Sequence, residues 1–143
     1  VLGSRGRGDV YKRQEQLGGG ICQVSSTLFS ALLYTDLEIV VRSNHSMPVS
    51  YLPMGMDAAV SWGAPDLKFK NNFDYPIKIS ASYSGGTISF KILGAKADDK
   101  EIDVKVEKTG EMSAKTYRKY YTNGKLTSTK LICSSKYKPL KSD

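Results

Sequence analysis

The chain contains few of the side chains that build metal sites and disulfide frameworks. It has two cysteines, Cys22 and Cys133, and a single histidine, His45, among 143 residues. A structural zinc ion usually takes four protein ligands, and a catalytic zinc ion takes three plus water. We therefore expect no metal site. The two cysteines could form a disulfide, but nothing in the sequence requires it.

Long apolar runs are also missing. No run approaches the ~20 residues that a membrane-spanning helix needs, and no signal peptide is recognisable. Because the chain does not begin with methionine, we interpret it as a fragment, and we expect this fragment itself to make no membrane contact. The 40% of hydrophobic and 24% of charged residues are typical of one globular domain, or of one domain with a small appendage.

Acidic residues are the minority among the charged ones. The chain has 21 Lys and Arg against 14 Asp and Glu, a formal net charge of +7. A basic surface favours anionic partners such as nucleic acid, anionic lipid or an anionic cell wall. The basic residues form no compact block and no nucleic-acid-binding motif is present, so we expect no nucleic-acid partner. An ordinary solvated surface is the alternative explanation.

One segment has the spacing of a helix, and most of the others have the spacing of strands. Ile21, Val24, Leu28 and Leu32 recur at three- and four-residue steps, which predicts a helix that ends near residues 34–36. Asn123-Gly124 predicts a type I′ hairpin between two runs of β-forming residues. Alternation and composition predict further strands or extended pieces at 37–43, 48–53, 57–62, 67–71, 76–83, 87–94 and 102–108.

These elements predict an α+β domain, with one N-terminal helix that carries Cys22 packed on a mainly antiparallel β-sheet, and with a C-terminal β-hairpin. Residues 1–16 are rich in Arg and Gly and show no periodicity, so we expect a leader that is disordered or foreign to the fold. We divide the remainder into a core domain, residues 17–95, and a C-terminal β extension, residues 96–143.

The stretch GGGICQVSSTLF, residues 18–29, places Cys22 at the start of the predicted helix. The first N–H groups of a helix lack intrahelical partners, and the helix dipole favours an anion there. A thiol at this position ionises easily, and the same N–H groups could hold the oxyanion that forms when a thiolate attacks a carbonyl. The glycines would let a substrate approach closely. The alternative is a buried cysteine beside a tight glycine turn.

His45 is the candidate base for this thiol. The predicted helix is about 21 Å long at ~1.5 Å per residue, and the strand at 37–43 is about 23 Å long at ~3.3 Å per residue. A strand that runs back along the helix would therefore bring His45 to Cys22. Asp57 is the first candidate for the group that orients the imidazole, and Asn44 is the second. A surface histidine and a turn aspartate are the structural alternatives.

Three stretches match a known family: GGGICQVSSTLFSALL, LEIVVRSNHSMPVSYLPMGMDAAVSW and PDLKFKNNFDYPIKI. From about Gly18 to Gly94 the chain strongly resembles the VanW family of bacterial envelope proteins. The tail TYRKYYTNGKLTSTKLICSSKYKP resembles the β segment that follows the core in many members. The segment VLGSRGRGDVYKRQEQ does not resemble the extended, glycine-containing segment that usually precedes the run of glycines.

The resemblance implies an enzyme of the cell wall. Some VanW-domain proteins are understood to be L,D-transpeptidases that use a catalytic cysteine to make 3→3 cross-links in peptidoglycan. By motif position Cys22 would be the nucleophile and His45 its base, and we add Asp57 as the orienting group. Ser25 and Ser26 could cap the helix instead of lining the site. The expected substrate-binding residues are Gly19, Gly20, Gln23, Ser25, Ser26, Asn44 and Ser46.

The implied partners are peptidoglycan stem peptides. The implied location is extracytoplasmic, in the cell wall or on the outer face of the cytoplasmic membrane, with the full-length protein anchored in that membrane. The Cys22 thiolate would attack the carbonyl between the third stem residue and the terminal D-alanine, a reaction that needs no metal or organic cofactor. The alternative is a non-catalytic module for wall binding or glycopeptide resistance, in which Cys22 is structural. We expect Cys133 to be a packing residue or a free thiol.

Overall fold

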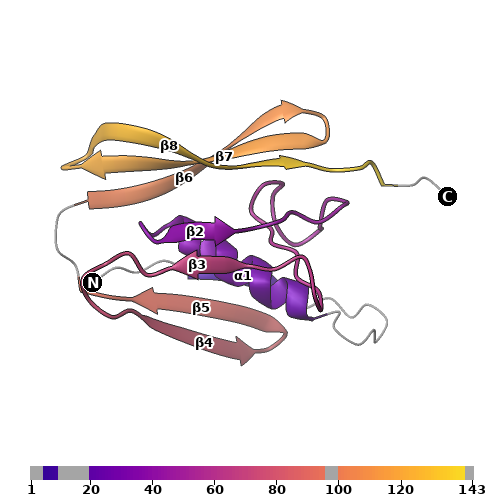
Figure 1. Ribbon diagram of the computed structural model, residues 1–143, viewed down its shortest axis with the longest axis horizontal. Helices are drawn as coiled ribbons and strands as arrows, with labels where there is room; N and C mark the ends of the chain where they lie inside the picture. Colours follow the sequence, from indigo (N-terminus) through magenta and orange to yellow (C-terminus); the bar gives the residue numbers. More distant parts are fainter. Residues whose placement is uncertain (1–4, 10–19, 96–99, 141–143) are drawn as a thin grey trace.

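The computed structural model describes residues 5–9, 20–95 and 100–140 of the chain. Within these ranges one helix and eight strands follow one another (Figure 1). Their bounds are Arg5–Asp9 for β1, Ile21–Leu33 for α1, Glu38–Val41 for β2, Lys68–Lys70 for β3, Lys78–Ser84 for β4, Thr87–Leu93 for β5, Lys100–Gly110 for β6, Ser113–Thr122 for β7 and Lys125–Lys136 for β8. No helix in these ranges has the length and apolar character needed to cross a membrane.

The strands form three separate antiparallel sheets. Their orders are β1-β5-β4, β2-β3 and β6-β7-β8. The predicted α+β class is therefore wrong, because the described chain is mostly β, with three small sheets and a single short helix. Alternation along a strand predicts that one of its faces is buried, but it does not identify the strand with which it pairs.

The predicted strand at 57–62 is a loop. Its backbone groups bond to a helix side chain and to an earlier part of the same loop rather than to a neighbouring strand. The N–H of Ala58 donates to Ser26 Oγ at 3.0 Å, and the N–H of Ala59 donates to the carbonyl of Ser43 at 2.8 Å. Residues 42–67 thus contain no helix or strand. Ala58 is fully buried by packing whereas Trp62 is 94% exposed, and alternation alone cannot distinguish such a loop from a strand.

Strand β1 lies inside the predicted leader, residues 1–16. It pairs antiparallel with β5, from Arg5 opposite Lys91 to Asp9 opposite Thr87. Within the leader that we expect to be disordered or foreign to the fold, residues 5–9 thus form a strand. The rest of the leader lies outside the described residues, and the predicted domain boundaries stay predictions.

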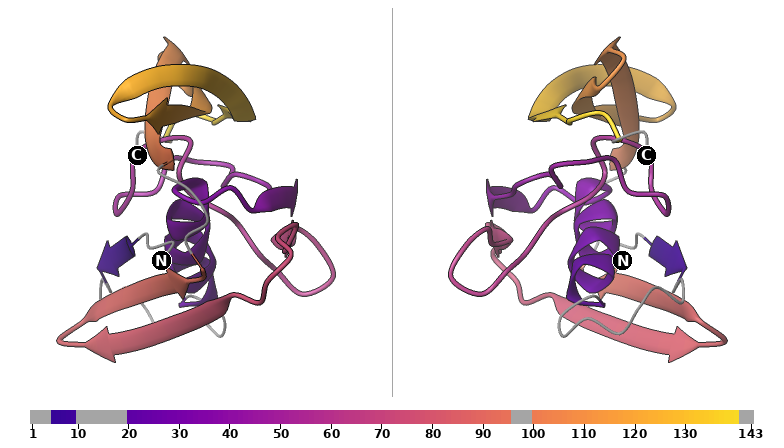
Figure 2. Two further views of the ribbon diagram at one scale, coloured as in Figure 1. Left: turned by 90° about the vertical axis from the view of Figure 1, so that its left-hand side faces the viewer. Right: turned by 90° about the vertical axis from the view of Figure 1, so that its right-hand side faces the viewer.

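Helix α1 lies between two layers of sheet, with β4 and β5 on one side and β6, β7 and β8 on the other (Figures 1 and 2). Each side has its own apolar cluster, and burial of a large apolar side chain contributes about 1.5–3 kcal/mol. The cluster toward β5 contains Ala31, Leu32, Leu37, Phe90 and Ile92. The cluster toward β6 and β8 contains Phe29, Leu33 and Ala58, with Val104, Ile132 and Cys133 packed against it.

A buried arginine attaches the C-terminal sheet to the end of the helix. Arg118 of β7 is 2% exposed, and it donates from Nε to the carbonyl of Leu33 at 3.0 Å and from Nη2 to that of Leu32 at 2.9 Å. The last carbonyl groups of a helix lack intrahelical partners and favour a positive charge. This contact therefore fixes α1 relative to the sheet that β7 belongs to.

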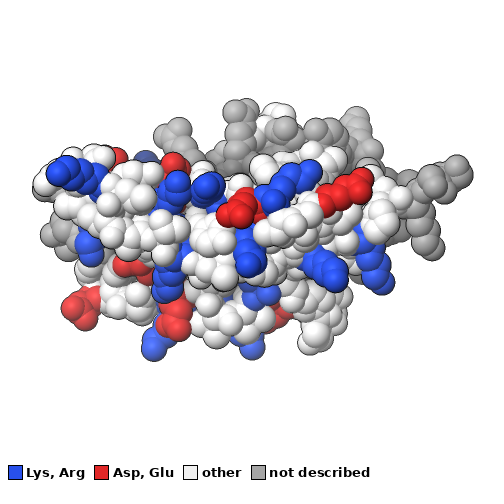
Figure 3. Space-filling model, turned by 90° about the horizontal axis from the view of Figure 1, so that it is seen from above, with Lys and Arg blue, Asp and Glu red and all other residues white. Residues whose placement is uncertain are grey.

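The turn between β7 and β8 has the conformation that its sequence predicts. Asn123 and Gly124 have φ angles of 49° and 77°, which a two-residue type I′ turn requires. The hairpin belongs to a three-stranded sheet with β6. Seen from the side of this sheet, Lys and Arg lie scattered among Asp and Glu instead of gathering in one block (Figure 3). Such interspersed charges are typical of a solvated surface.

Candidate functional site

Cys22 lies in the first turn of α1. Its side chain is partly buried, and its thiol donates to the carbonyl of Val60, with 3.3 Å between sulfur and oxygen. Gly20 is the N-cap residue, and no side chain caps the helix. The N–H of Val24 donates to the carbonyl of Gly20 at 3.2 Å. The earlier N–H groups of the turn have no partner within the helix, as expected for an α-helix N-terminus.

Gly20 does not need to be glycine for conformational reasons. Its φ of −87° is an ordinary value for any residue, and a Cβ built there would meet no atom within 4 Å. Backbone freedom therefore does not explain the glycine at this position. Gly19, which we predicted to bind substrate, and Gly18 lie outside the described residues.

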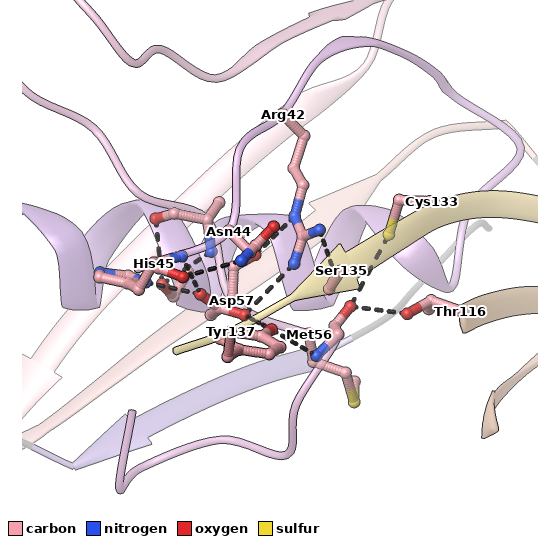
Figure 4. Close-up of polar contacts among 12 residues, drawn as sticks. Arg42, Asn44, His45, Met56, Asp57, Thr116, Cys133, Ser135 and Tyr137 are labelled. Carbon is pink, nitrogen blue, oxygen red and sulfur yellow. Dashed lines mark hydrogen bonds and ion pairs between the residues drawn. The ribbon is translucent and has the colours of Figure 1, made fainter. Parts of the chain in front are cut away.

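His45 and Asp57 come from two parts of the 42–67 loop, called here the His45 loop (residues 42–46) and the Asp57 loop (residues 55–60), and they are joined side chain to side chain (Figure 4). His45 Nδ1 lies 2.6 Å from Asp57 Oδ2, and the backbone N–H of His45 donates to the same oxygen at 2.8 Å. The Asp57 side chain is 1% exposed, whereas that of His45 is 20% exposed. The imidazole is thus the accessible end of the pair, and the carboxylate is its buried support.

Asp57 is held ionised, and this fixes the proton on His45. Burial by itself would raise the pKa of Asp57, but hydrogen bonds from the ring and backbone of His45 and from Tyr137, with the charge of Arg42, hold that pKa below its usual value. A carboxylate can only accept hydrogen bonds. The imidazole proton therefore lies on Nδ1, and Nε2 of the neutral ring keeps a lone pair that can take a proton.

Two further side chains bind the other oxygen of Asp57. Arg42 Nη2 lies 3.2 Å from Oδ1, and Arg42 Nε donates to the backbone carbonyl of Asp57 at 2.7 Å. The hydroxyl of Tyr137 donates to Oδ1 as well. Arg42 also packs over the ring of Phe29 in α1, 5.0 Å from its centroid. Each carboxylate oxygen accepts two hydrogen bonds, so the carboxylate cannot rotate freely.

Ser25 and Ser26 bind the protein's own backbone. The hydroxyl of Ser26 accepts the N–H of Ala58 at 3.0 Å and lies 3.1 Å from the Ala58 carbonyl. The hydroxyl of Ser25 donates to that carbonyl at 2.6 Å. Both serines are buried, and neither caps the helix. Their observed partner is a loop of the protein, and a role in substrate binding stays a prediction.

Residues 57–60 connect the His45–Asp57 pair to the helix turn that carries Cys22. The first residue of this segment binds His45, the second is held by two serines of α1, and the last, Val60, accepts the thiol. Four consecutive residues thus hold the imidazole and the thiol in one framework.

Cys22 and His45 themselves are not joined by a hydrogen bond in the described structure. Tyr51 lies near both parts of the site. Burial raises the pKa of the Tyr51 phenol, a hydrogen bond with Ser26 opposes this, and the proximity of Cys22 and Asp57 raises it further. The thiol, the phenol and the carboxylate therefore share one electrostatic environment.

The remaining predicted residues lie close to the same loops. Gln23 is buried in the first turn of α1. Asn44 does not orient the imidazole, because its Nδ2 donates to the backbone carbonyls of His45 at 2.7 Å and of Lys136 at 2.9 Å. Ser46 is exposed, and its carbonyl accepts the N–H of Lys138 at 2.7 Å. Asn44 and Ser46 thus attach the His45 loop to the end of β8, and their roles toward a substrate stay predictions.

Sequence reasoning missed Arg42, Tyr51 and Tyr137. Arg42 stands at the end of a run of β-branched residues and three positions before the only histidine, which is a usable signal. Tyr51 lies two positions before Pro53, in a segment whose sequence predicts only an extended piece. Tyr137 is separated from Asp57 by 80 positions, and no local pattern could connect the two.

The described residues offer no group of three His, Cys, Asp or Glu side chains that could hold a metal ion. Cys22 and Cys133 are both free thiols. Cys133 packs against the apolar cluster between α1 and β8, and its sulfur lies 3.9 Å from the carbonyl oxygen of Gly55. Cys133 is thus a free thiol in a packing position, as the sequence predicted.

Two curated proteins resemble this chain. It is 46% identical over 97 residues to the Uncharacterized protein YoaR of Bacillus subtilis (strain 168), a match that covers 62% of this chain and 32% of that protein. It is 37% identical over 89 residues to the Vancomycin B-type resistance protein VanW of Enterococcus faecalis (strain ATCC 700802 / V583), a match that covers 59% of this chain and 31% of that protein. The matched part is thus about a third of the length of these relatives. No solved structure matches the chain significantly.

A family assignment follows from the extent of the family match. Residues 7–93 match the family described as VanW like protein, which is more than half of the chain. The match includes the turn that carries Cys22 and the loops that carry His45 and Asp57. The chain therefore belongs to the VanW family, which includes a vancomycin resistance protein.

Proposed function

We propose that this chain carries a cysteine-dependent acyl-transfer site, an L,D-transpeptidase that acts on peptidoglycan stem peptides outside the cytoplasm. The observation that carries the proposal is the 57–60 segment, which holds an oriented His45–Asp57 pair and the Cys22 thiol in one framework. A nucleophile, a base and a group that orients the base are the parts that covalent acyl transfer uses. The family resemblance supplies the substrate class.

The first half-reaction forms a thioester. Cys22 turns away from the Val60 carbonyl by rotation about χ1, and its proton passes to Nε2 of His45. The sulfur attacks the carbonyl between the third stem residue and D-alanine, and the N–H groups of the first turn of α1 hold the oxyanion. The C–N bond then breaks, and His45 gives its proton to the departing D-alanine amine.

The second half-reaction transfers the acyl group. The side-chain amine of a second stem peptide attacks the thioester carbon while His45 takes a proton from it. A 3→3 amide bond forms, the sulfur leaves, and the proton on His45 returns to Cys22. Water as the acceptor would give a carboxypeptidase instead. Neither half-reaction needs a metal or an organic cofactor.

The competing candidate is a non-catalytic module of glycopeptide resistance or wall binding. The observation that favours it is the partner of the Cys22 thiol, which is the Val60 carbonyl rather than His45. The printed name of the Enterococcus faecalis relative is compatible with either candidate.

Differential alkylation separates the two candidates. The chain is treated with iodoacetamide at pH 6 to 7, and modification of Cys22 and Cys133 is followed by peptide mass spectrometry. A catalytic Cys22 reacts faster than Cys133 and faster than free cysteine, and His45→Gln slows Cys22 alone. The non-catalytic candidate predicts a Cys22 that stays inert until the protein is denatured and that does not respond to His45→Gln.

A further inference from the structure

The end of β8 reaches the candidate site from a part of the chain that lies outside the family match, which ends at residue 93. Tyr137 directly follows β8 and is 5% exposed. We propose that Tyr137 is a positioning residue that fixes Asp57, and through it His45, so that the sheet of β6, β7 and β8 is part of the catalytic unit. This inference rests on the function proposed above.

The hydroxyl of Tyr137 connects two positions of one loop. It donates to Asp57 Oδ1 and accepts the backbone N–H of Gly55 at 2.8 Å. Burial raises the pKa of Tyr137, and the hydrogen bond to Asp57 raises it further, so the phenol keeps its proton. That single proton points to the carboxylate, and the oxygen lone pair faces Gly55. Tyr137 therefore holds the Asp57 side chain and the loop before it at the same time.

The sheet binds Gly55 a second time. The hydroxyl of Thr116 in β7 donates to the Gly55 carbonyl at 2.8 Å. Gly55 has a φ of +90°, and a Cβ at this position would lie 2.5 Å from Thr116 Oγ1. Both backbone polar groups of Gly55 thus bind side chains of the C-terminal part of the chain, and only glycine fits so close to β7.

Four consecutive residues, the last two of β8 and the two that follow it, contact the two loops of the site. These contacts are Ser135 with Arg42, Lys136 with Asn44, Tyr137 with Asp57 and Lys138 with Ser46. The first joins Ser135 Oγ to Arg42 Nη1 at 2.6 Å, and Arg42 is itself a partner of Asp57. These contacts hold the His45 loop in position at Arg42, Asn44 and Ser46.

Loss of the Tyr137 hydroxyl would leave Oδ1 of Asp57 with Arg42 as its one remaining partner and would leave the Gly55 N–H unpaired. The carboxylate could then rotate, and the imidazole would lose its fixed orientation. Proton transfer depends on this orientation. Tyr137 is buried behind Asp57 and acts through it, so its loss should lower kcat while KM stays nearly unchanged.

The kinetic test compares Tyr137→Phe with Tyr120→Phe. The Tyr120 hydroxyl, in the same sheet, donates to Asp36 Oδ1 at 2.9 Å, so the control removes the same kind of contact elsewhere. Tyr137→Phe should lower kcat about 10-fold, part of the 10²–10⁴-fold that acid–base catalysis contributes. Its KM should stay within about twofold, and the control should match the wild type. An unchanged kcat in Tyr137→Phe would contradict the proposal.

A spectroscopic test works without turnover. His45 is the only histidine, so nitrogen-15 NMR reports one imidazole. The wild type and Tyr120→Phe should show the proton on Nδ1, whereas Tyr137→Phe should show a mixture of tautomers. The carbon-13 titration of the Asp57 carboxyl should also move to higher pH in Tyr137→Phe alone. If both signals stay at their wild-type positions, the positioning role is overturned, even where turnover falls.

A wild type without turnover counts against the proposed function, and the NMR result still decides the role of Tyr137.

A second variant covers the case in which Tyr137→Phe does not fold cooperatively. Ser135→Ala removes the contact to Arg42 Nη1 and the hydrogen bond between the Ser135 and Tyr137 side chains, and it leaves the Tyr137 hydroxyl in place. It should move the Asp57 titration in the same direction by a smaller amount. An Asp57 titration identical to that of the wild type in Ser135→Ala would contradict the proposal.

Discussion

His45 and Asp57 are joined twice through one carboxylate oxygen, which lies 2.6 Å from the ring Nδ1 and accepts the backbone N–H of His45 at 2.8 Å. The double contact fixes the imidazole and its loop together. Because Arg42 and Tyr137 bind the other oxygen, His45 is the exposed end of a buried hydrogen-bond network. Such a network is rigid only while every member keeps its partners.

Asp57→Asn should remove most turnover. An amide of the same shape cannot accept both hydrogen bonds from His45 in the way a carboxylate does, so the imidazole adopts the other tautomer. The equivalent change in a Ser-His-Asp enzyme lowers kcat by about 10⁴, and a loss of about 10³–10⁴ is expected here. The measurement is release of D-alanine from a stem tetrapeptide. A loss smaller than tenfold would remove Asp57 from the mechanism.

Asp57 should also determine stability toward acid. Its pKa is lower in the folded protein than in the unfolded chain, so its contribution to stability is complete above the unfolded value of ~3.9 and is lost as pH falls through the folded value. Urea unfolding midpoints measured downward from pH 5 should therefore fall more steeply in the wild type than in Asp57→Asn. If the urea midpoint falls equally steeply with pH in the wild type and in Asp57→Asn, Asp57 has the same pKa in the folded and the unfolded chain.

Gly55→Ala should be strongly destabilising. The new Cβ would clash with Thr116 Oγ1 at 2.5 Å, and the φ of +90° disfavours any side chain. Strain and clash together should cost more than about 2 kcal/mol of unfolding free energy. Gly85→Ala is the matched control, because Gly85 has a φ of +55° but open space around it, and it should cost about 1 kcal/mol. Similar losses in the two variants would mean that Thr116 yields to the new side chain.

Ser26→Ala should weaken the link between α1 and the 57–60 segment. The buried Ala58 N–H loses its partner, and an unpaired buried donor costs about 1–3 kcal/mol. The exposed Ser50 provides the control, since Ser50→Ala should change unfolding free energy by less than about 0.5 kcal/mol. Chemical denaturation measures both. Turnover at a temperature where Ser26→Ala remains folded should also fall, whereas unchanged turnover would show that the segment does not align the site.

The sequence could predict the local parts of the site. The 3.6-residue periodicity places Cys22 at the start of a helix, and the lone histidine and the Asp57 turn draw attention by their chemistry. The contact between His45 and Asp57 spans only 12 positions. These features depend on residues that lie close together in the chain, so one sequence is enough to predict them.

The sequence could not predict the parts that depend on distant pairing. The division into three sheets depends on which strands meet, and alternation gives only the buried face of each strand. The contact of Tyr137 with Asp57 arises from the way β8 crosses the loops, and a tyrosine in a β-rich tail has many ordinary roles. Gly20 has an ordinary backbone conformation, which a run of glycines in the sequence does not reveal.

The most direct test of Cys22 as the nucleophile is trapping of the acyl-enzyme. The chain is mixed with a stem tetrapeptide that ends in D-alanine, under conditions where binding is detected, and is quenched in acid for intact and peptide mass spectrometry. Cys22 should carry the mass of the tripeptide acyl group in the wild type and in Cys133→Ser, and no adduct should form in Cys22→Ser. Binding without any adduct in the wild type, or an adduct that persists in Cys22→Ser, would contradict the proposed mechanism.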